Sequence, residues 1–382
     1  MSRVLLALYN GLYDSTDCEK LPCWYDSIVK GLRKRGHSVF LWQIKEFAPP
    51  KTNFGETDKD FLKEYAPDIC LSFNNVLPNI DGIVDCPVVT ILVDSVKYLS
   101  NNDLLNNRII GCFQYANYAY LIDKYGCAKD HVHILTPFTE IRPNSNIMPN
   151  TNISFIGTRF GVPKHAEIGY FSIDKGTRDE YCACLEYIKK NPLVDEEDVF
   201  SACSVQSEYV RSNLVVSDVL SMLSAEKRVR TLSAIVDLGL ELYGTRSWLE
   251  RYHFDSRLNA AFVDREVYSL EHNQEIYNRS KIGLNVSHVQ AVDGFPWRVL
   301  DILSSNSCLV TDWHDKFKTC FDGLYFPVYH DEYEAREICK MLLRDETARK
   351  QIVEDCNKYV CNNYSIDIFL GQLSDISGIN LD

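Results

Sequence analysis

The sequence predicts an α/β protein with two Rossmann-like, doubly wound parallel-sheet domains that face each other across a cleft. Its length of 382 residues, 46% of them hydrophobic, suits two cores better than one. Short apolar runs alternate with polar helical stretches in both halves, which is typical of parallel sheets covered on both faces. Residues 143–152 are polar and contain two prolines, so we expect a linker there.

The N-terminal half, residues 1–148, is predicted to form the first domain. Apolar runs rich in β-branched residues and separated by polar stretches predict its strands. A helix at 23–35 follows the first strand and is expected to end at Gly36. We expect strands at residues 3–9, 38–42, 68–73, 88–93, 109–113 and 131–135.

The C-terminal half, residues 149–382, begins a second series of the same kind. Residues 165–237 differ, because apolar positions there follow helical spacing, and we expect a largely helical insertion. The last segment, 365–382, is a candidate to pack back on the first domain. Strands are predicted at 152–157, 240–244, 260–263, 282–286 and 308–311, and helices at 333–344 and 346–360.

Composition excludes some classes of function. The formal net charge is −13, and the one basic run, 31–35, reads as the end of a helix, so a nucleic-acid binder is not expected. No apolar run approaches the ~18 residues of a membrane span. The 14 scattered cysteines suggest free thiols in a reducing, cytoplasmic compartment. A peripheral contact with a membrane stays compatible with the sequence.

Neither a metal nor a bound cofactor is predicted. Cys182 with Cys184, and Cys356 with Cys361, lack the second ligand pair of a zinc site. The Asp-Lys-Asp motif at 58–60 could hold a divalent cation, but no strand precedes it. Acidic residues in the first turn of a helix explain this motif better.

The stretch from 277 to 312 carries the most chemical information. It reads as helix, strand, loop, helix start and strand. A loop followed by a helix start supplies free N–H groups, and Arg298 adds a planar set of donors, which together suit a diphosphate. Asp301 lies three residues later and could accept from both hydroxyls of a ribose. The alternative is an ordinary helix-surface pair between Arg298 and Asp301.

With these residues in place, the sequence resembles the CgeB-like glycosyltransferases, part of the wider group 1 glycosyltransferases with the GT-B fold. The resemblance rests on residues 280–287 (SKIGLNVS), followed by Gly294, Arg298 and the acidic residue 301. Three further matches, 153–157 (ISFIG), 242–244 (LYG) and 86–94 (CPVVTILVD), occur in the family's order. Together the motifs span about residues 68–325.

The resemblance implies a sugar-nucleotide donor held by the C-terminal domain, with the N-terminal domain on the acceptor side. Strand-end residues would then meet the diphosphate or the base, although Arg159 also fits a surface arginine, Tyr243 a core aromatic and His288 a structural histidine. The implied donor-binding residues are Gly157, Thr158, Arg159, Tyr243, Gly244, Asn285, Ser287, His288, Gly294, Arg298 and Asp301.

Two carboxylates are candidates for catalysis. Many retaining relatives carry two glutamates seven residues apart, and Asp293 and Asp301 match that spacing with shorter side chains. The shorter reach leaves open whether Asp293 contacts the sugar and whether configuration is retained. Asp94 follows a buried strand and could be a general base, an acceptor ligand or a helix cap. Asp14 and Asp17, after the turn at 10–11, are weaker candidates.

The sequence therefore predicts a metal-independent glycosyltransferase. It would move a sugar from a nucleotide-diphosphate sugar to a hydroxyl of a glycan, a lipid-linked saccharide or a protein. UDP is the nucleotide we favour, although no residue identifies the base. The alternatives are a non-catalytic nucleotide- or carbohydrate-binding module and a sugar-nucleotide epimerase of the same architecture.

Overall fold

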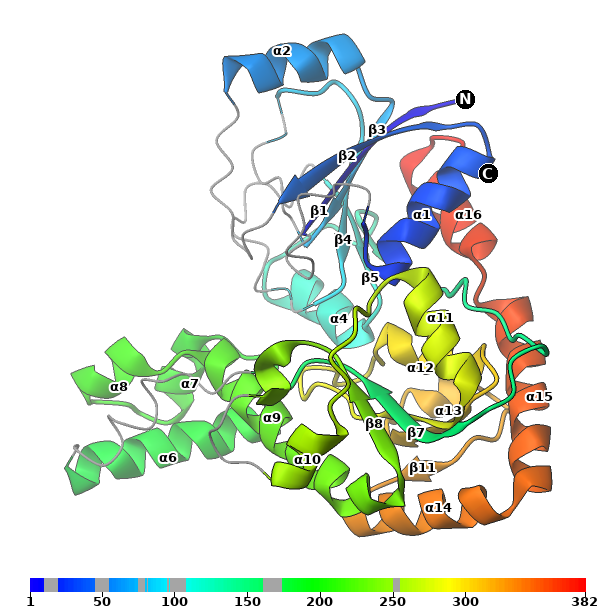
Figure 1. The fold of residues 1–382 in the computed structure, drawn as a ribbon. Helices are drawn as coiled ribbons and strands as arrows, with labels where there is room; N and C mark the ends of the chain where they lie inside the picture. The colour runs from blue at the N-terminus through cyan, green and yellow to red at the C-terminus, as the bar shows by residue number, and fades with distance from the viewer. Residues whose placement is uncertain are drawn as a thin grey trace.

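The computed structural model shows two α/β lobes stacked on each other (Figure 1). Each lobe holds one fully parallel sheet, so the predicted fold class is confirmed. The segment after the first sheet, 135–150, leads into the second. The structure describes residues 1–9, 20–44, 55–74, 80, 82–94, 96, 108–160, 174–249 and 255–382.

The N-terminal sheet has the strand order β2-β1-β3-β4-β5-β6. The inner strand β1 is buried on both faces because helices cover them, which explains its unbroken apolar sequence. The strands are β1 (Arg3–Tyr9), β2 (Ser38–Ile44), β3 (Ile69–Phe73), β4 (Val88–Leu92), β5 (Ile109–Cys112) and β6 (Val132–Ile134). Helices here include α1 (Cys23–Lys34), α2 (Glu56–Tyr65) and α4 (Tyr115–Asp123).

The C-terminal sheet has the strand order β11-β10-β9-β7-β8. Its strands are β7 (Thr151–Ile156), β8 (Leu240–Tyr243), β9 (Ser280–Asn285), β10 (Cys308–Asp312) and β11 (Val328–Tyr329). The helices around it are α10 (Ser256–Ala261), α11 (Leu270–Arg279), α12 (Trp297–Leu303), α13 (Phe317–Cys320), α14 (Glu332–Arg344) and α15 (Glu346–Asn363).

One predicted strand is wrong. Residues 260–263 were expected to be a strand, but α10 runs to Ala261 and only Phe262 makes an isolated bridge, to Leu242. The helix forms because the Asp255 side chain accepts a hydrogen bond from the backbone N–H of Arg257 and caps its first turn. The two-residue strand β11 was missed, since so short a segment has no periodicity to detect.

A helical subdomain projects from one side of the C-terminal lobe, in green in Figure 1. It consists of α6 (Lys175–Lys190), α7 (Glu196–Ala202), α8 (Glu208–Asn213) and α9 (Val216–Ile235). The first three helices and the start of α9 enclose a small apolar core of their own, built from residues such as Cys184, Ile188, Val199, Phe200, Val210 and Leu220.

The last helix, α16 (Ile366–Ser377), lies beside α1 on the N-terminal lobe (Figure 1). Its Phe369, Leu370 and Leu373 share one core with Val4 and Leu6 of β1. The chain thus crosses between the lobes twice, once through 135–150 and once between α15 and α16. Among the described residues, no helix is long and apolar enough to span a membrane.

Candidate active site at the domain interface

A cavity of about 280 Å³ lies between the two lobes, at the carboxyl ends of their strands. This is the edge where open parallel sheets bind ligands. The N-terminal lobe contributes residues just after β4 and β5 and from the start of α1, and the C-terminal lobe contributes the loop after β9 and the start of α12. The wall residues used below are Trp24, Asp94, Phe113, Gln114, Tyr268, His288, Gln290, Trp297, Arg298 and Asp301.

Arg298 stands in the first turn of α12 and lines this cavity. Its guanidinium carbon lies 4.8 Å from the centroid of the Phe155 ring, so the ring face supports the charge. Its Nη1 is buried and has no hydrogen-bond partner among the described residues. A buried guanidinium donor without an acceptor is costly, so this group is suited to an anion that enters the cavity.

Three more buried donors on the cavity wall lack a hydrogen-bond partner within the described parts of the chain. They are the indole Nε1 atoms of Trp24 and Trp297 and the hydroxyl of Tyr268. Burial raises the pKa of Tyr268 to about 12, so its hydroxyl keeps its proton. A wall of unpaired donors favours a ligand rich in acceptor atoms, such as a phosphate ester.

Arg228, on α9, was missed by the sequence analysis. It is buried, with Nε 3.3 Å from the Val286 carbonyl oxygen and Nη1 bonded to the Thr158 carbonyl oxygen. Burial, with the nearby charge of Arg298, lowers its pKa to about 9. It therefore brings positive charge behind the cavity and ties β7 to the β9 loop. No motif marked it, because helical spacing does not reveal which surface a side chain meets.

Asp301 lines the same cavity and is 5% exposed. Its Oδ1 accepts a hydrogen bond of 2.6 Å from Thr139, which lies in the segment between the sheets. Burial raises the pKa of Asp301 to about 7, although Thr139 and the charge of Arg298 oppose the shift. Asp301 is buried and bonds to Thr139, and Arg298 Nη1 has no partner among the described residues, so the two do not form a simple helix-surface pair.

Asp94 reaches the cavity from the N-terminal lobe. Its Oδ2 accepts from Asn74 Nδ2 at 2.7 Å, and its Oδ1 accepts from Gln290 Nε2 of the other lobe at 3.1 Å. Burial raises the pKa of Asp94 above its ordinary value, despite these two bonds. The carboxylate is thus oriented from both domains and is a stronger proton acceptor than an exposed aspartate.

The loop after β9 joins the two lobes. Besides the Gln290 bond, the N–H of Val292 donates to Gln114 Oε1 at 3.1 Å. Gly294 packs so closely on Gln114 that a Cβ would lie 2.4 Å from its Cγ. Asp293 Oδ2 accepts from the N–H of Ala116 at 3.0 Å and so caps the start of α4. Asp293, predicted near the sugar, is therefore engaged with a helix and does not line the cavity.

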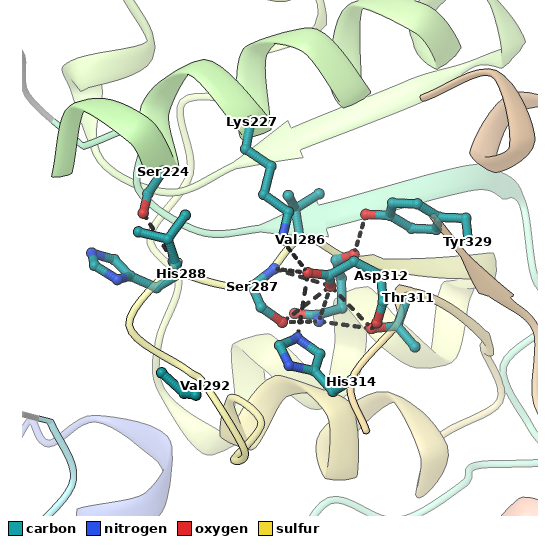
Figure 2. Close-up of polar contacts among 12 residues, drawn as sticks. Ser224, Lys227, Val286, Ser287, His288, Val292, Thr311, Asp312, His314 and Tyr329 are labelled. Atoms are coloured by element: carbon teal, nitrogen blue, oxygen red, sulfur yellow. Dashed lines mark hydrogen bonds and ion pairs between the residues drawn. The ribbon is translucent and has the colours of Figure 1, made fainter. Parts of the chain in front are cut away.

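Asn285 and Ser287 also differ from the prediction. Both are 0% exposed and belong to a buried network around Asp312 rather than to the cavity wall. Figure 2 shows Ser287 beside Asp312 in this network. Asp312 accepts from the N–H and Oγ of Ser287, from Asn285 Nδ2 and from Lys227 Nζ at 2.6–3.2 Å. Burial opposes its charge, but His314 and Lys227 outweigh that cost and hold the pKa of Asp312 well below its ordinary value. The network fixes the strand ends that carry the bridging loop.

Four predicted residues do not line the cavity. Tyr243 is 1% exposed, and its hydroxyl bonds to Glu241, so it is a core aromatic. Gly244 has φ of 144°, and a Cβ there would lie 2.2 Å from the Gly157 oxygen. Arg159 is 4% exposed and does not line the cavity. The Thr158 side chain accepts from the N–H of Phe160 at 3.2 Å.

His288 lines the cavity, as predicted. Gly157 does not line the cavity, but it lies beside the side chain of Arg298. The N–H of Gln290 donates to His288 Nδ1 at 3.1 Å, so a neutral ring carries its hydrogen on Nε2. Burial, together with the charges of Arg228 and Lys227, lowers the pKa of His288 to about 3. The ring is therefore a neutral hydrogen-bond donor at physiological pH.

The remaining predictions concern possible metal ligands and acidic residues. Asp58 caps α2 by accepting from the N–H of Gly55 at 2.9 Å. No group of three or more His, Cys, Asp or Glu side chains within the described ranges has an arrangement that could hold a metal ion. Asp14, Asp17 and the turn at 10–11 lie outside the described residues.

A protein-family model matches part of the chain. Residues 226–373 match the family model described as glycosyl transferase-like. No curated protein sequence matches the chain.

Solved structures match over almost the whole chain. A glycosyltransferase from Rickettsia africae has a TM-score of 0.52 at 13% identity, covering 99% of this chain and 98% of that one. HepE from Anabaena, solved with UDP and glucose, has a TM-score of 0.52 at 10% identity, covering 98% and 99%. An α-glucosyltransferase solved with UDP-glucose and DNA has a TM-score of 0.55 at 12% identity, covering 98% of both chains.

At these identities the structural matches establish the fold. The family model adds a sequence match over residues 226–373. The resemblance to the group 1 glycosyltransferases is confirmed, while the narrower CgeB-like group stays a prediction. The chain has the GT-B fold, and its residues 226–373 match the glycosyl transferase-like family model.

Proposed function

We propose that this protein transfers a sugar from a nucleotide-diphosphate sugar to a hydroxyl group of an acceptor. The observation that carries the proposal is Arg298, whose buried Nη1 faces an interdomain cavity without a partner among the described residues. Relatives solved with UDP or UDP-glucose support UDP as the nucleotide to test first.

The C-terminal lobe would hold the donor. Arg298 would bond to the diphosphate, and a charge-assisted hydrogen bond of this kind contributes about 1.5–3 kcal/mol. Arg228 does not line the cavity, but its charge adds positive potential there. Two of its donors stay bonded to backbone carbonyls. Both charges would stabilise the diphosphate as it leaves. Asp301, on the same wall, is our candidate for the ribose hydroxyls.

The N-terminal lobe would activate the acceptor through Asp94. The acceptor hydroxyl would give its proton to the carboxylate as its oxygen bonds to the anomeric carbon and the bond to the diphosphate breaks. Burial raises the pKa of Asp94, which makes it a better base near neutral pH. This scheme inverts the anomeric configuration. The neutral His288 would donate a hydrogen bond from Nε2 to the sugar.

We further propose that the reaction needs no divalent metal. Arg298 and Arg228 bring two positive charges to the diphosphate position, which is the role a cation serves in other transferases. The acceptor would be a glycan, a lipid-linked saccharide or a protein. EDTA should therefore leave turnover unchanged.

Two measurements test the proposal. A thermal-shift panel with UDP, GDP, CMP and dTDP should show stabilisation by one of them, because a ligand of the folded state raises the melting temperature. The preferred donor, incubated with acceptor panels, should then yield free nucleotide and a glycoside with inverted configuration by NMR. An isomerised donor would identify an epimerase, binding without turnover a non-catalytic module, and no stabilisation by any nucleotide would contradict the donor site.

A further inference from the structure

Two tryptophans, one from each lobe, stack on each other and line the cavity. Trp24 is the second residue of α1, and Trp297 is the first residue of α12. Their ring centroids are 5.6 Å apart and their planes differ by 5°. Phe113 and Phe138 meet the Trp297 ring edge-on or nearly so, with centroids at 4.9 and 5.6 Å. The pair is thus held in a fixed orientation by rings of the N-terminal lobe.

Stacking alone does not account for the polar edges of these rings. Both Nε1 atoms are buried. That of Trp297 has no acceptor among the residues that the structure describes, and that of Trp24 makes no hydrogen bond of normal length and angle there, although it lies near enough to the Tyr25 hydroxyl to oppose the effect of burial on the pKa of Tyr25. An indole N–H can only donate, and buried indoles usually find an acceptor. Since both residues line the cavity, the acceptor is expected from the ligand.

The position of Trp297 indicates which part of the ligand supplies it. Trp297 immediately precedes Arg298, whose Nη1 is also unpaired in the described structure. Trp24, Trp297 and Arg298 all line the same cavity, so one ligand can be met by all three donors. Three unpaired N–H donors fit the oxygens of a phosphate group better than a sugar, whose hydroxyls also need acceptors.

The place of Trp24 depends on how α1 meets the C-terminal lobe. The N–H of Cys23 donates to the Tyr268 carbonyl oxygen at 2.6 Å. On the same helix, Lys30 Nζ lies 2.8 Å from Glu271 Oε1 of the C-terminal lobe. These contacts hold the start of α1, and with it Trp24, against the C-terminal lobe.

We propose that Trp24 and Trp297 donate their indole N–H groups to the phosphate oxygens of the donor. This inference rests on the proposed function. Trp24 then makes the N-terminal lobe a direct ligand of the donor, and binding of the diphosphate draws α1 onto the C-terminal lobe. The two indoles thus position the donor and couple its binding to closure of the two lobes.

The test replaces each tryptophan by phenylalanine, which keeps a ring for stacking and removes the N–H. We expect Trp24→Phe and Trp297→Phe each to weaken UDP binding about tenfold in titration calorimetry, while binding of uridine, which lacks phosphate, is unchanged. Trp313→Phe is the matched control, because its Nε1 already donates to Asp315 and it lies outside the cavity wall.

Unchanged UDP affinity in folded Trp24→Phe, while Arg298→Ala loses UDP, would overturn the inference and leave the proposed function standing. Equal weakening toward UDP and uridine would also overturn it, because the ring would then shape the cavity and not contact phosphate. If wild-type protein binds no nucleoside diphosphate, both proposals fall. If Trp24→Phe does not fold, Trp297→Phe makes the same test from the other lobe.

Discussion

Two polar regions of the C-terminal lobe, only a short loop apart, have opposite hydrogen-bonding states. Around Asp312 the carboxylate is met by donors from Lys227, Asn285 and Ser287, and the network is closed to the cavity. Around Arg298 the donors face the cavity without partners among the described residues. The charged groups around Asp312 stabilise the fold, whereas the guanidinium of Arg298 remains available to a ligand. Substitutions in the two regions should therefore affect different measurements.

The largest effect should come from the carboxylate that we assign to the reaction. Asp94→Asn removes the proton acceptor and should lower kcat by about 10²–10⁴-fold. Asp130→Asn, an exposed position in the same lobe, is the control. Because burial raises the pKa of Asp94, wild-type turnover should fall as pH drops through that raised value, on the acid side. Full activity in Asp94→Asn would remove it from the mechanism.

Asp312→Ala should act on the fold. It leaves the donors of Asn285 and Ser287 buried without an acceptor and Lys227 without its ion pair, so we expect the free energy of unfolding to fall by about 3–5 kcal/mol. Urea denaturation of this variant beside Asp322→Ala, an exposed aspartate nearby, measures the effect. A stability equal to wild type would show that the network is not structural.

Asp301 should give a pH-dependent stability of opposite sign to an ordinary aspartate. Its pKa is about 7 in the folded protein and about 3.9 when unfolded, so its contribution is fully present below pH 4 and is lost as pH rises through 7. Relative to Asp301→Asn, the wild type should lose about 3 kcal/mol between pH 5 and pH 8. If the free energy of unfolding of the two proteins changes in parallel with pH, the raised pKa of Asp301 is contradicted.

The smallest effect, on UDP binding, should come from a substitution at the contact with the helical subdomain. Lys124, at the end of α4, pairs with Asp195 and Asp198 of the subdomain and so links the two lobes. These side chains are partly exposed, so Lys124→Ala should weaken UDP binding by less than about fivefold, and less at high salt. Lys175→Ala, which breaks a pair within α6, should have no effect. Equal results for both variants would exclude a role in closure.

The sequence predicted the fold well because its signals are local. Buried parallel strands such as β1 have unbroken apolar runs, and their ends fell within a few residues of the prediction. The exceptions had specific causes: a side-chain cap began α10 where a strand was expected, and β11 is too short to show a pattern.

The site was predicted less completely, because a side chain's direction depends on partners far along the chain. Arg298, His288, Asp301 and Asp94 do line the cavity. Asn285 and Ser287 sit at the same strand end, but a carboxylate 25 or more residues away turns them inward. Trp24 and Arg228 escaped notice for the same reason, since only the folded chain brings α1 and α9 to the cavity.

The most direct test of the central claim is the affinity of Arg298→Ala for UDP, measured by titration calorimetry beside thermal unfolding. The account predicts a loss of about 10–100-fold in affinity with an unchanged melting temperature, because the removed guanidinium binds a ligand and not the fold. Wild-type affinity in this variant, or a large loss of stability without a change in UDP binding, would contradict it.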